Sequence, residues 1–241
     1  MASIHGVIFD MDGTVFDSEC LAIVAFMDAA RRFGFQMTEQ MHFNLTGHVE
    51  PDCLSEMQRM YGADKDIAGW RRCIRQKKAE MRAAQGGHVG RRPGLLELLS
   101  YLREREIPFA IASSSTRQTI DSYLESEYLL HEFTNIVDGS QVERGKPDPE
   151  IFYKAAALID TDPAHTLVLE DGLAGLTAAK TGGFIAGFVY DDLSFAGSVD
   201  TGYPILVPLK SFDDGRELAD ASFDTLADVI DAIETDRLVR Q

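Results

Sequence analysis

Residues 6–14 read GVIFDMDGT, and this stretch indicates the architecture of the whole chain. The apolar run 6–9 is short, contains β-branched and aromatic residues, and stops at Asp10, as a strand buried on both faces does. Asp10 and Asp12 lie two residues apart, and Gly13 allows a tight turn after them. Two carboxylates at a buried strand end are costly unless a cation lies near them. The alternative is an Asp-rich surface turn.

Outward from this stretch, short apolar runs alternate with helical patterns. Further strands are predicted at residues 108–112, 135–137, 165–169 and 184–189. Helices with apolar residues three and four apart are predicted at residues 94–104, 116–124, 148–158 and 172–181. The alternation predicts an α/β fold, a Rossmann-like parallel sheet with helices on both faces, whose ligands bind beyond the carboxyl ends of the strands. Residues 222–226 indicate a late edge strand before a closing helix.

One segment breaks this alternation. From residue 17 to about residue 82 the pattern is helical throughout, and a glycine-rich stretch at 86–90 forms a flexible, hinge-like linker back to the next helix. We therefore expect an α/β core of residues 1–16 and 90–241, with a small helical cap domain of residues 17–89 inserted into it.

Composition limits the partners. The net charge of −16 opposes nucleic acids and anionic membranes, and no apolar stretch approaches membrane-spanning length. Three cysteines without paired spacing, and no secretory signal pattern, favour a cytoplasmic protein. We expect a monomer or weak homodimer. Within residues 17–92 basic side chains slightly outnumber acidic ones, so this segment is expected to help bind an anion.

Two further predicted strands lead to groups that can bind phosphate. Residues 112–116 read ASSST before a helix, where hydroxyls and backbone N–H groups bind phosphate oxygens, although plain N-capping by Thr116 is the alternative. Residues 145–149 read GKPDP, in which Lys146 can neutralise a transferring phosphoryl group or simply be a surface lysine.

A second acidic strand end lies at residues 167–172, which read LVLEDG. Glu170 and Asp171 follow this strand as Asp10 and Asp12 follow the first. Two acidic strand ends predict one shared Mg²⁺ ion, while carboxylates that stabilise the next helix N-terminus are the alternative.

In this order, the four segments resemble the signature motifs of the haloacid dehalogenase-like hydrolase superfamily. The position of the helical insert resembles the branch that contains phosphoglycolate phosphatase-like and β-phosphoglucomutase-like enzymes. The resemblance implies that Asp10 is the nucleophile and that Asp12 is the general acid and base. It implies phosphate-binding roles for Ser113 and Lys146, with Ser114 beside the substrate. The implied Mg²⁺ ligands are Asp10, the Asp12 carbonyl, Glu170 and Asp171.

The same resemblance separates the activities within the superfamily. Haloacid dehalogenases proper and phosphonoacetaldehyde hydrolases lack the second Asp of the first motif, so Asp12 favours phosphate esters. Mutases of the branch have a cap His where this chain has Ala22 and a phosphate-binding Arg where it has Glu50, so both positions favour a phosphatase.

The cap is expected to bind the leaving group of the substrate. Residues 45–48 resemble the specificity loop of the family, which makes Gly47 and His48 candidate substrate contacts. Arg71, Arg75, Lys78 and Arg82 share a helical face that is either solvated or turned to the substrate. Arg75 and Lys77 are the predicted contacts, with Lys78 as the alternative to Lys77.

The sequence thus predicts a magnesium-dependent phosphatase that hydrolyses a small phosphorylated metabolite through an aspartyl-phosphate. A β-phosphoglucomutase-like phosphomutase is the first alternative, and a non-catalytic protein that binds phosphorylated metabolites is the second.

Overall fold

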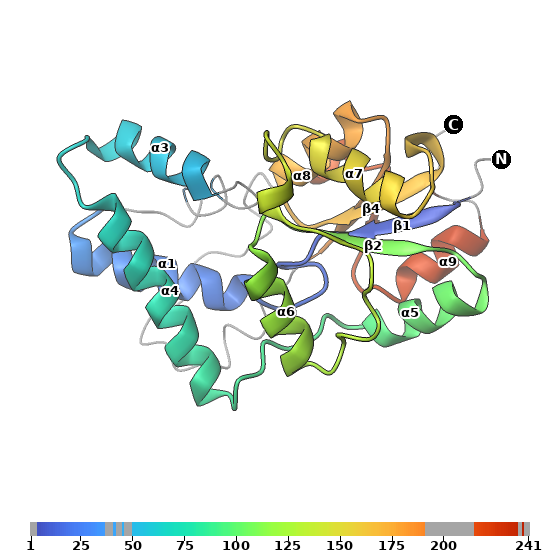
Figure 1. Cartoon of the computed structure of the whole chain (residues 1–241), viewed down its shortest axis with the longest axis horizontal. Coiled ribbons are helices and arrows are strands. Elements are labelled where there is room, and N and C mark those ends of the chain that lie inside the picture. Colours follow the sequence, from blue (N-terminus) through green and yellow to red (C-terminus); the bar gives the residue numbers. More distant parts are fainter. Residues whose placement is uncertain are drawn as a thin grey trace.

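The computed structural model describes residues 4–36, 41, 45, 50–190, 215–235 and 238 (Figure 1), with only the backbone of Cys20 and Glu50. Among these residues, no helix has both the length and the apolar composition needed to cross a membrane.

A six-stranded sheet forms the centre of the molecule. Its strands are β1 (Gly6–Phe9), β2 (Phe109–Ala112), β3 (Ile136–Val137), β4 (Thr166–Glu170), β5 (Ile185–Val189) and β6 (Ala221–Phe223). Their spatial order is β3-β2-β1-β4-β5-β6, and every neighbouring pair is parallel. The predicted α/β class is confirmed, and the strand expected at 222–226 is β6 at the edge of the sheet.

Helices cover both faces of this sheet (Figure 1). They are α5 (Leu95–Glu104), α6 (Arg117–Ser126), α7 (Glu150–Leu158), α8 (Leu173–Thr181) and α9 (Asp228–Glu234), with the short 3₁₀ turns η1 (Gly139–Gln141), η2 (Pro163–His165) and η5 (Arg216–Leu218). Figure 1 shows α7 and α8 on one side of the strands and α5 and α9 on the other.

Alternate residues of each strand enter separate cores. Val7 and Phe9 of β1 pack in a cluster with the apolar residues of α5 and α9, whereas Ile8 packs with those of α7 and α8. Each central strand is therefore buried on both faces, as the continuous apolar runs predict. The carboxylates lie at the strand ends, with Asp10 just beyond β1 and Glu170 as the last residue of β4.

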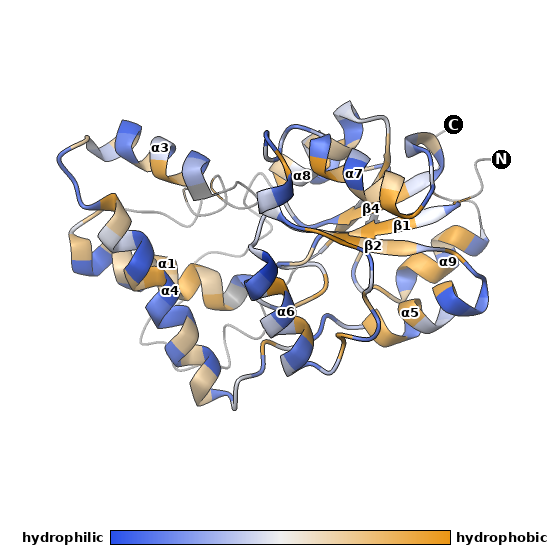
Figure 2. Ribbon diagram, viewed as in Figure 1, coloured by the Kyte–Doolittle hydropathy of each residue, from blue (hydrophilic) through white to orange (hydrophobic). Residues whose placement is uncertain are grey.

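The helical insertion follows β1 and comprises α1 (Glu19–Phe33), α3 (Glu50–Tyr61) and α4 (Ile67–Ala84). These helices lie to one side of the sheet in Figure 1, and each combines hydrophobic and hydrophilic residues in Figure 2. They share an apolar cluster of their own in which Trp70 is fully buried. This arrangement is consistent with a cap, and the boundaries at residues 17 and 89 stay a prediction.

The linker after α4 is anchored at its end. A single buried carboxylate oxygen of Glu127, the residue that follows α6, accepts the backbone N–H groups of Val89 and Gly90, each at 3.0 Å, and lies 3.2 Å from His88 Nδ1. The glycines of this linker have left-handed backbone conformations, with φ of 72° at Gly86 and 90° at Gly87. The chain thus turns at its glycines and is fixed to the core by Glu127 where it returns.

Candidate active site

The predicted nucleophile lies at the centre of the site. Asp10 directly follows β1, its backbone N–H donates to the Leu169 carbonyl of β4, and its side chain is buried. Lys146 Nζ donates to Asp10 Oδ1 at 2.5 Å and to Glu170 Oε1 at 2.6 Å. The structure therefore brings together Asp10, Lys146 and Glu170, which come from three separate stretches of the chain.

Burial gives these groups unusual electrostatics. Burial alone would lower the pKa of Lys146, but the carboxylates of Asp10 and Glu170 raise it above the ordinary value, so the lysine stays charged. Burial, together with Glu170 and Asp12, raises the pKa of Asp10 well above the usual range for aspartate despite the opposing effect of Lys146. The single cation of Lys146 therefore does not compensate all the negative charge at these strand ends.

The residues present fit a divalent cation. Oxygen atoms of Asp10, Glu170 and Asp171 lie within 4.8 Å of one another, and carboxylate oxygens are the ligands that Mg²⁺ prefers. Gly13 makes this approach possible, because a Cβ at that residue would lie 1.9 Å from Asp171 Oδ2, and its φ is +80°. The excess negative charge and this close packing both support the predicted metal site.

Glu170 holds the second strand end in shape. Its Oε2 accepts the backbone N–H groups of Asp171 at 3.1 Å and Gly172 at 3.2 Å, while Oε1 binds Lys146. A Cβ at Gly175 would lie 1.8 Å from Glu170 Oε1, so only glycine leaves room for this carboxylate. Glu170 thus orients both Lys146 and the Asp171 loop, whether or not it also binds a metal directly.

The predicted acid and base is held by two hydroxyl groups. Ser18 Oγ donates to Asp12 Oδ1 at 2.7 Å, and Ser115 Oγ donates to Asp12 Oδ2 at 2.9 Å. Ser18 precedes α1 of the insertion, whereas Ser115 follows β2 of the core. Asp12 therefore bridges the two parts of the molecule, and neither serine was singled out for this role from sequence because a hydroxyl residue carries little specific signal.

The hydroxyl stretch after β2 lies at the same edge of the sheet. Ser113 is buried, and its Oγ accepts the backbone N–H of Ser115 at 3.1 Å. Ser114 lies against the first residue of η1, where a Cβ at Gly139 would meet its carbonyl oxygen at 2.4 Å. Thr116 caps α6 and accepts the Thr119 N–H, so the capping alternative is confirmed for this residue. Phosphate binding by Ser113 and Ser114 stays a prediction.

One cation from the insertion approaches Asp12. Lys78 of α4 is hydrogen bonded to the hydroxyl of Tyr123 on α6 and interacts electrostatically with Asp12 and Glu19. Burial alone would lower the pKa of Lys78, but Tyr123, Asp12 and Glu19 raise it above the ordinary value. Tyr123 is buried and lies on the apolar side of α6 with Ile120. The sequence did not predict its contact with Lys78.

For the other residues of the cap that were predicted to matter for substrate binding, the structure gives the exposure of some and does not describe others. Arg75 is exposed on α4, and Lys77 and Lys78 are both partly exposed. Among these residues, an electrostatic interaction with Asp12 is described for the alternative residue Lys78. Ala22 is buried in α1. Gly47 and His48 lie outside the described residues, as does the side chain of Glu50. All these substrate contacts stay predictions.

Comparison with known proteins gives the family. A family model described as haloacid dehalogenase-like hydrolase matches residues 7–187, which span the strand-end carboxylates and Lys146. The chain belongs to this family. The expected enzyme class, a haloacid dehalogenase-like hydrolase, is thereby confirmed.

Two relatives and one solved structure show which proteins this haloacid dehalogenase-like hydrolase is similar to. It is 28% identical over 179 residues to a phosphorylated carbohydrates phosphatase of Thermotoga maritima, covering 74% of this chain and 82% of the relative. It is 29% identical over 184 residues to a β-phosphoglucomutase of Bacillus subtilis, covering 75% and 80%. A solved β-phosphoglucomutase from Clostridium difficile superposes with a TM-score of 0.73 at 18% identity, covering 98% of this chain and 100% of that one, which shows the shared fold.

Proposed function

We propose that this haloacid dehalogenase-like hydrolase is a magnesium-dependent phosphatase of small phosphorylated metabolites and uses Asp10 as a covalent nucleophile. The observation that carries the proposal is the grouping of Asp10 with Lys146, Glu170 and Asp171 at the ends of two adjacent parallel strands. A buried lysine between two carboxylates supplies a fixed positive charge where a phosphoryl group needs one.

In the first half-reaction, a carboxylate oxygen of Asp10 attacks the phosphorus of the ester. The bond between phosphorus and the ester oxygen breaks, and protonated Asp12 gives its proton to the departing alkoxide. Lys146 stays beside Asp10 and balances charge on the transferring group. In this proposal, Ser113 and Ser114 bind its oxygens.

In the second half-reaction, Asp12 removes a proton from water, and the resulting hydroxide attacks the phosphorus of the aspartyl-phosphate. The bond between phosphorus and the Asp10 oxygen breaks, which releases inorganic phosphate and restores both carboxyl groups. Ser18 and Ser115 keep Asp12 directed for both proton transfers. A Mg²⁺ ion bound by Asp10, the Asp12 carbonyl, Asp171 and in part Glu170 would offset the negative charge of these groups and of the phosphate.

Phosphorylated carbohydrates are the substrate class that we favour. The phosphatase relative of Thermotoga maritima supports this choice by its name. Lys78, which lies near Asp12, is well placed to hold a hydroxyl or a charged group of the leaving alcohol as it departs.

A phosphomutase is the second candidate, because the Bacillus subtilis relative is named as one. A mutase must bind a second phosphate group away from Asp10. Buried Ala22 offers no hydrogen-bond donor from its side chain for that purpose, and Glu50 would add negative charge, so both residues favour hydrolysis.

The test is a phosphate-release assay over a panel of phosphorylated sugars, polyols, nucleotides and phosphoglycolate, with Mg²⁺ and with a chelator. β-Glucose 1-phosphate is assayed separately for isomerisation. Magnesium-dependent phosphate release from at least one compound is the expected result. Isomerisation without release would replace the phosphatase by a mutase, and no reaction in either assay would favour a binding protein.

A further inference from the structure

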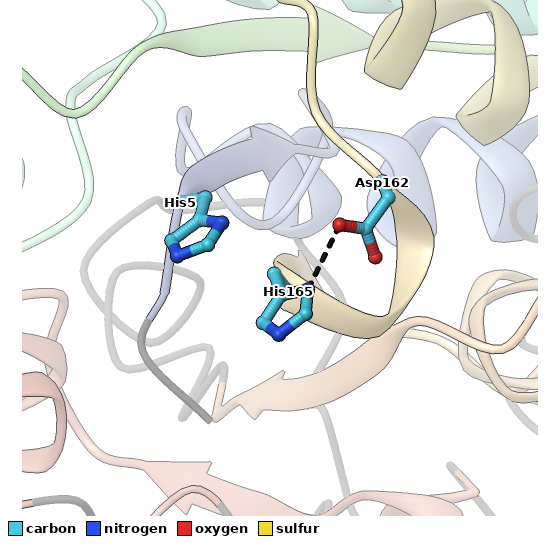
Figure 3. A group of neighbouring side chains, drawn as sticks. All are labelled: His5, Asp162 and His165. Atoms are coloured by element: carbon cyan, nitrogen blue, oxygen red, sulfur yellow. Dashed lines mark hydrogen bonds and ion pairs between the residues drawn. The ribbon is translucent and has the colours of Figure 1, made fainter. Parts of the chain in front are cut away.

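A second group of metal-binding side chains lies at the opposite ends of the same strands. His5 immediately precedes β1, His165 is the last residue of η2 before β4, and Asp162 precedes that turn (Figure 3). Asp10 and Asp171 follow the far ends of these two parallel strands. The length of the sheet therefore separates this group from the candidate active site.

The backbone holds these three residues together. The His5 N–H donates to the His165 carbonyl at 2.8 Å, which continues the parallel pairing of β1 with β4 by one residue. The His165 N–H donates to the Asp162 carbonyl at 3.2 Å, and the Thr166 hydroxyl donates to the same carbonyl at 2.6 Å. Two segments far apart in the sequence thus present their side chains to one point.

The side chains themselves are close. The imidazole rings of His5 and His165 are stacked, with centroids 4.6 Å apart and planes 13° from parallel. His165 Nδ1 lies 2.8 Å from Asp162 Oδ2, and this hydrogen bond is the main cause that lowers the pKa of Asp162, so the carboxylate is ionised. Figure 3 shows the His165 ring against the Asp162 carboxylate and the His5 ring on the neighbouring strand segment.

We propose that His5, Asp162 and His165 bind a divalent transition-metal ion, with Zn²⁺ as the best match. One ligand atom from each residue lies within 4.8 Å of the others. Ligand atoms of a tetrahedral zinc ion are about 3.3 Å apart, and the Asp162–His165 pair is already within this range. Rotation of the exposed His5 side chain would bring its ring nitrogen to the same distance. Two imidazoles favour Zn²⁺ over Mg²⁺, which prefers oxygen ligands.

This site differs from the candidate active site in chemistry as well as in place. The active-site group offers carboxylate oxygens alone, whereas this group offers two nitrogens and one carboxylate. A zinc ion here would cross-link the segment before β1 to the turn before β4 and stabilise the folded chain. Water would complete its coordination, because His5 and Asp162 are exposed.

The test is calorimetric titration of the full chain with Zn²⁺ in the presence of excess Mg²⁺. The Mg²⁺ occupies the carboxylates of the candidate active site, so that the titration reports on the second group. The variants are His5→Ala and Asp162→Asn, and His131→Ala is the matched control because His131 lies beside a single carboxylate, that of Glu132, at 3.3 Å. We expect one zinc per wild-type or H131A chain. We expect binding at least tenfold weaker in H5A, and weakened in D162N.

Thermal unfolding gives a second readout. Zn²⁺ should raise the melting temperature of the wild type and of H131A but not that of H5A. If H5A does not fold, D162N decides, since it changes only an exposed carboxylate. Unchanged zinc affinity in H5A and D162N overturns the proposal, as does zinc binding that is lost only in Asp171→Asn, which would place the ion among the active-site carboxylates.

Discussion

At the scale of single residues, the site is organised around one buried ammonium group. Lys146 is 1% exposed and binds both Asp10 and Glu170, so each carboxylate depends on the same partner. Removing a partner from such a group leaves an uncompensated buried charge, which is far more costly than losing a surface ion pair. Asp10 and Lys146 must therefore be tested with substitutions that preserve shape.

Asp10→Asn is the most direct test of the covalent route. The amide keeps the size and one oxygen of the carboxylate but cannot attack phosphorus, so kcat should fall by about 10⁴-fold or more. The measurement is phosphate release in Mg²⁺, with circular dichroism as the check that the variant folds. Residual activity within tenfold of the wild type would exclude Asp10 as the nucleophile.

Lys78→Ala and Lys77→Ala form a matched pair on one helix. Lys78 interacts with Tyr123 and Asp12, whereas Lys77 has no such contact among those described. K78A should lower kcat/KM by about 10²-fold, in the range for loss of one polar group at a reacting centre, and K77A by less than about threefold. A larger loss in K77A would restore the sequence prediction that Lys77 is the substrate contact.

At the scale of elements, α6 connects the site with the insertion. Ser115, just before it, binds Asp12, and Tyr123 on it contacts Lys78. The guanidinium of Arg82, near the end of α4, lies 4.6 Å from the centre of the Tyr123 ring and donates to Ser122 Oγ at 3.3 Å. Glu127 then holds the linker. The helix and the residues that flank it thus contact Asp12, Lys78 and the return point of the insertion.

Glu127→Ala should destabilise the protein without touching the strand-end carboxylates. The buried N–H groups of Val89 and Gly90 lose their acceptor, which should lower the free energy of unfolding by about 1–3 kcal/mol. The measurement is urea denaturation, with Glu125→Ala on the exposed face of α6 as the control, expected to change stability by less than about 0.5 kcal/mol. Equal effects in the two variants would show that Glu127 does not anchor the linker.

The elements were more predictable from sequence than their contacts. The helix expected at 94–104 is α5 (Leu95–Glu104), and the strand expected at 184–189 is β5 (Ile185–Val189), because buried strands and amphipathic helices leave periodic apolar patterns. The choice between Lys77 and Lys78 depends on how α4 lies against α6, and the role of Glu127 depends on where the linker returns. Both are set by tertiary packing that no local pattern records.

At the scale of the whole molecule, the strand-end carboxylates make folding and metal binding interdependent. Bringing Asp10, Glu170 and Asp171 together costs electrostatic free energy, and Lys146 offsets only part of it. A cation that binds only the folded chain therefore stabilises it in proportion to the logarithm of its concentration.

Mg²⁺ should accordingly raise the melting temperature, with stabilisation of about 2.7 kcal/mol at a concentration 100 times its dissociation constant. A chelator should reverse the shift. Asp171→Asn should abolish it, whereas Asp64→Asn, at a side chain that is 78% exposed, should not. A shift of equal size in D171N would mean that Mg²⁺ stabilises the chain from another position.

The pairing of β1 with β4 also has a consequence for synthesis on the ribosome. β1 is made first, but its two neighbours in the sheet, β2 and β4, follow only after the whole helical insertion, and β4 is the later of the two. The backbone N–H and C=O groups on the edge of β1 next to β4 therefore stay unpaired while more than half of the chain is translated. A nascent chain that has not yet reached Glu170 lacks two of the four carboxylates of the proposed active site, so phosphatase activity should begin abruptly, late in translation.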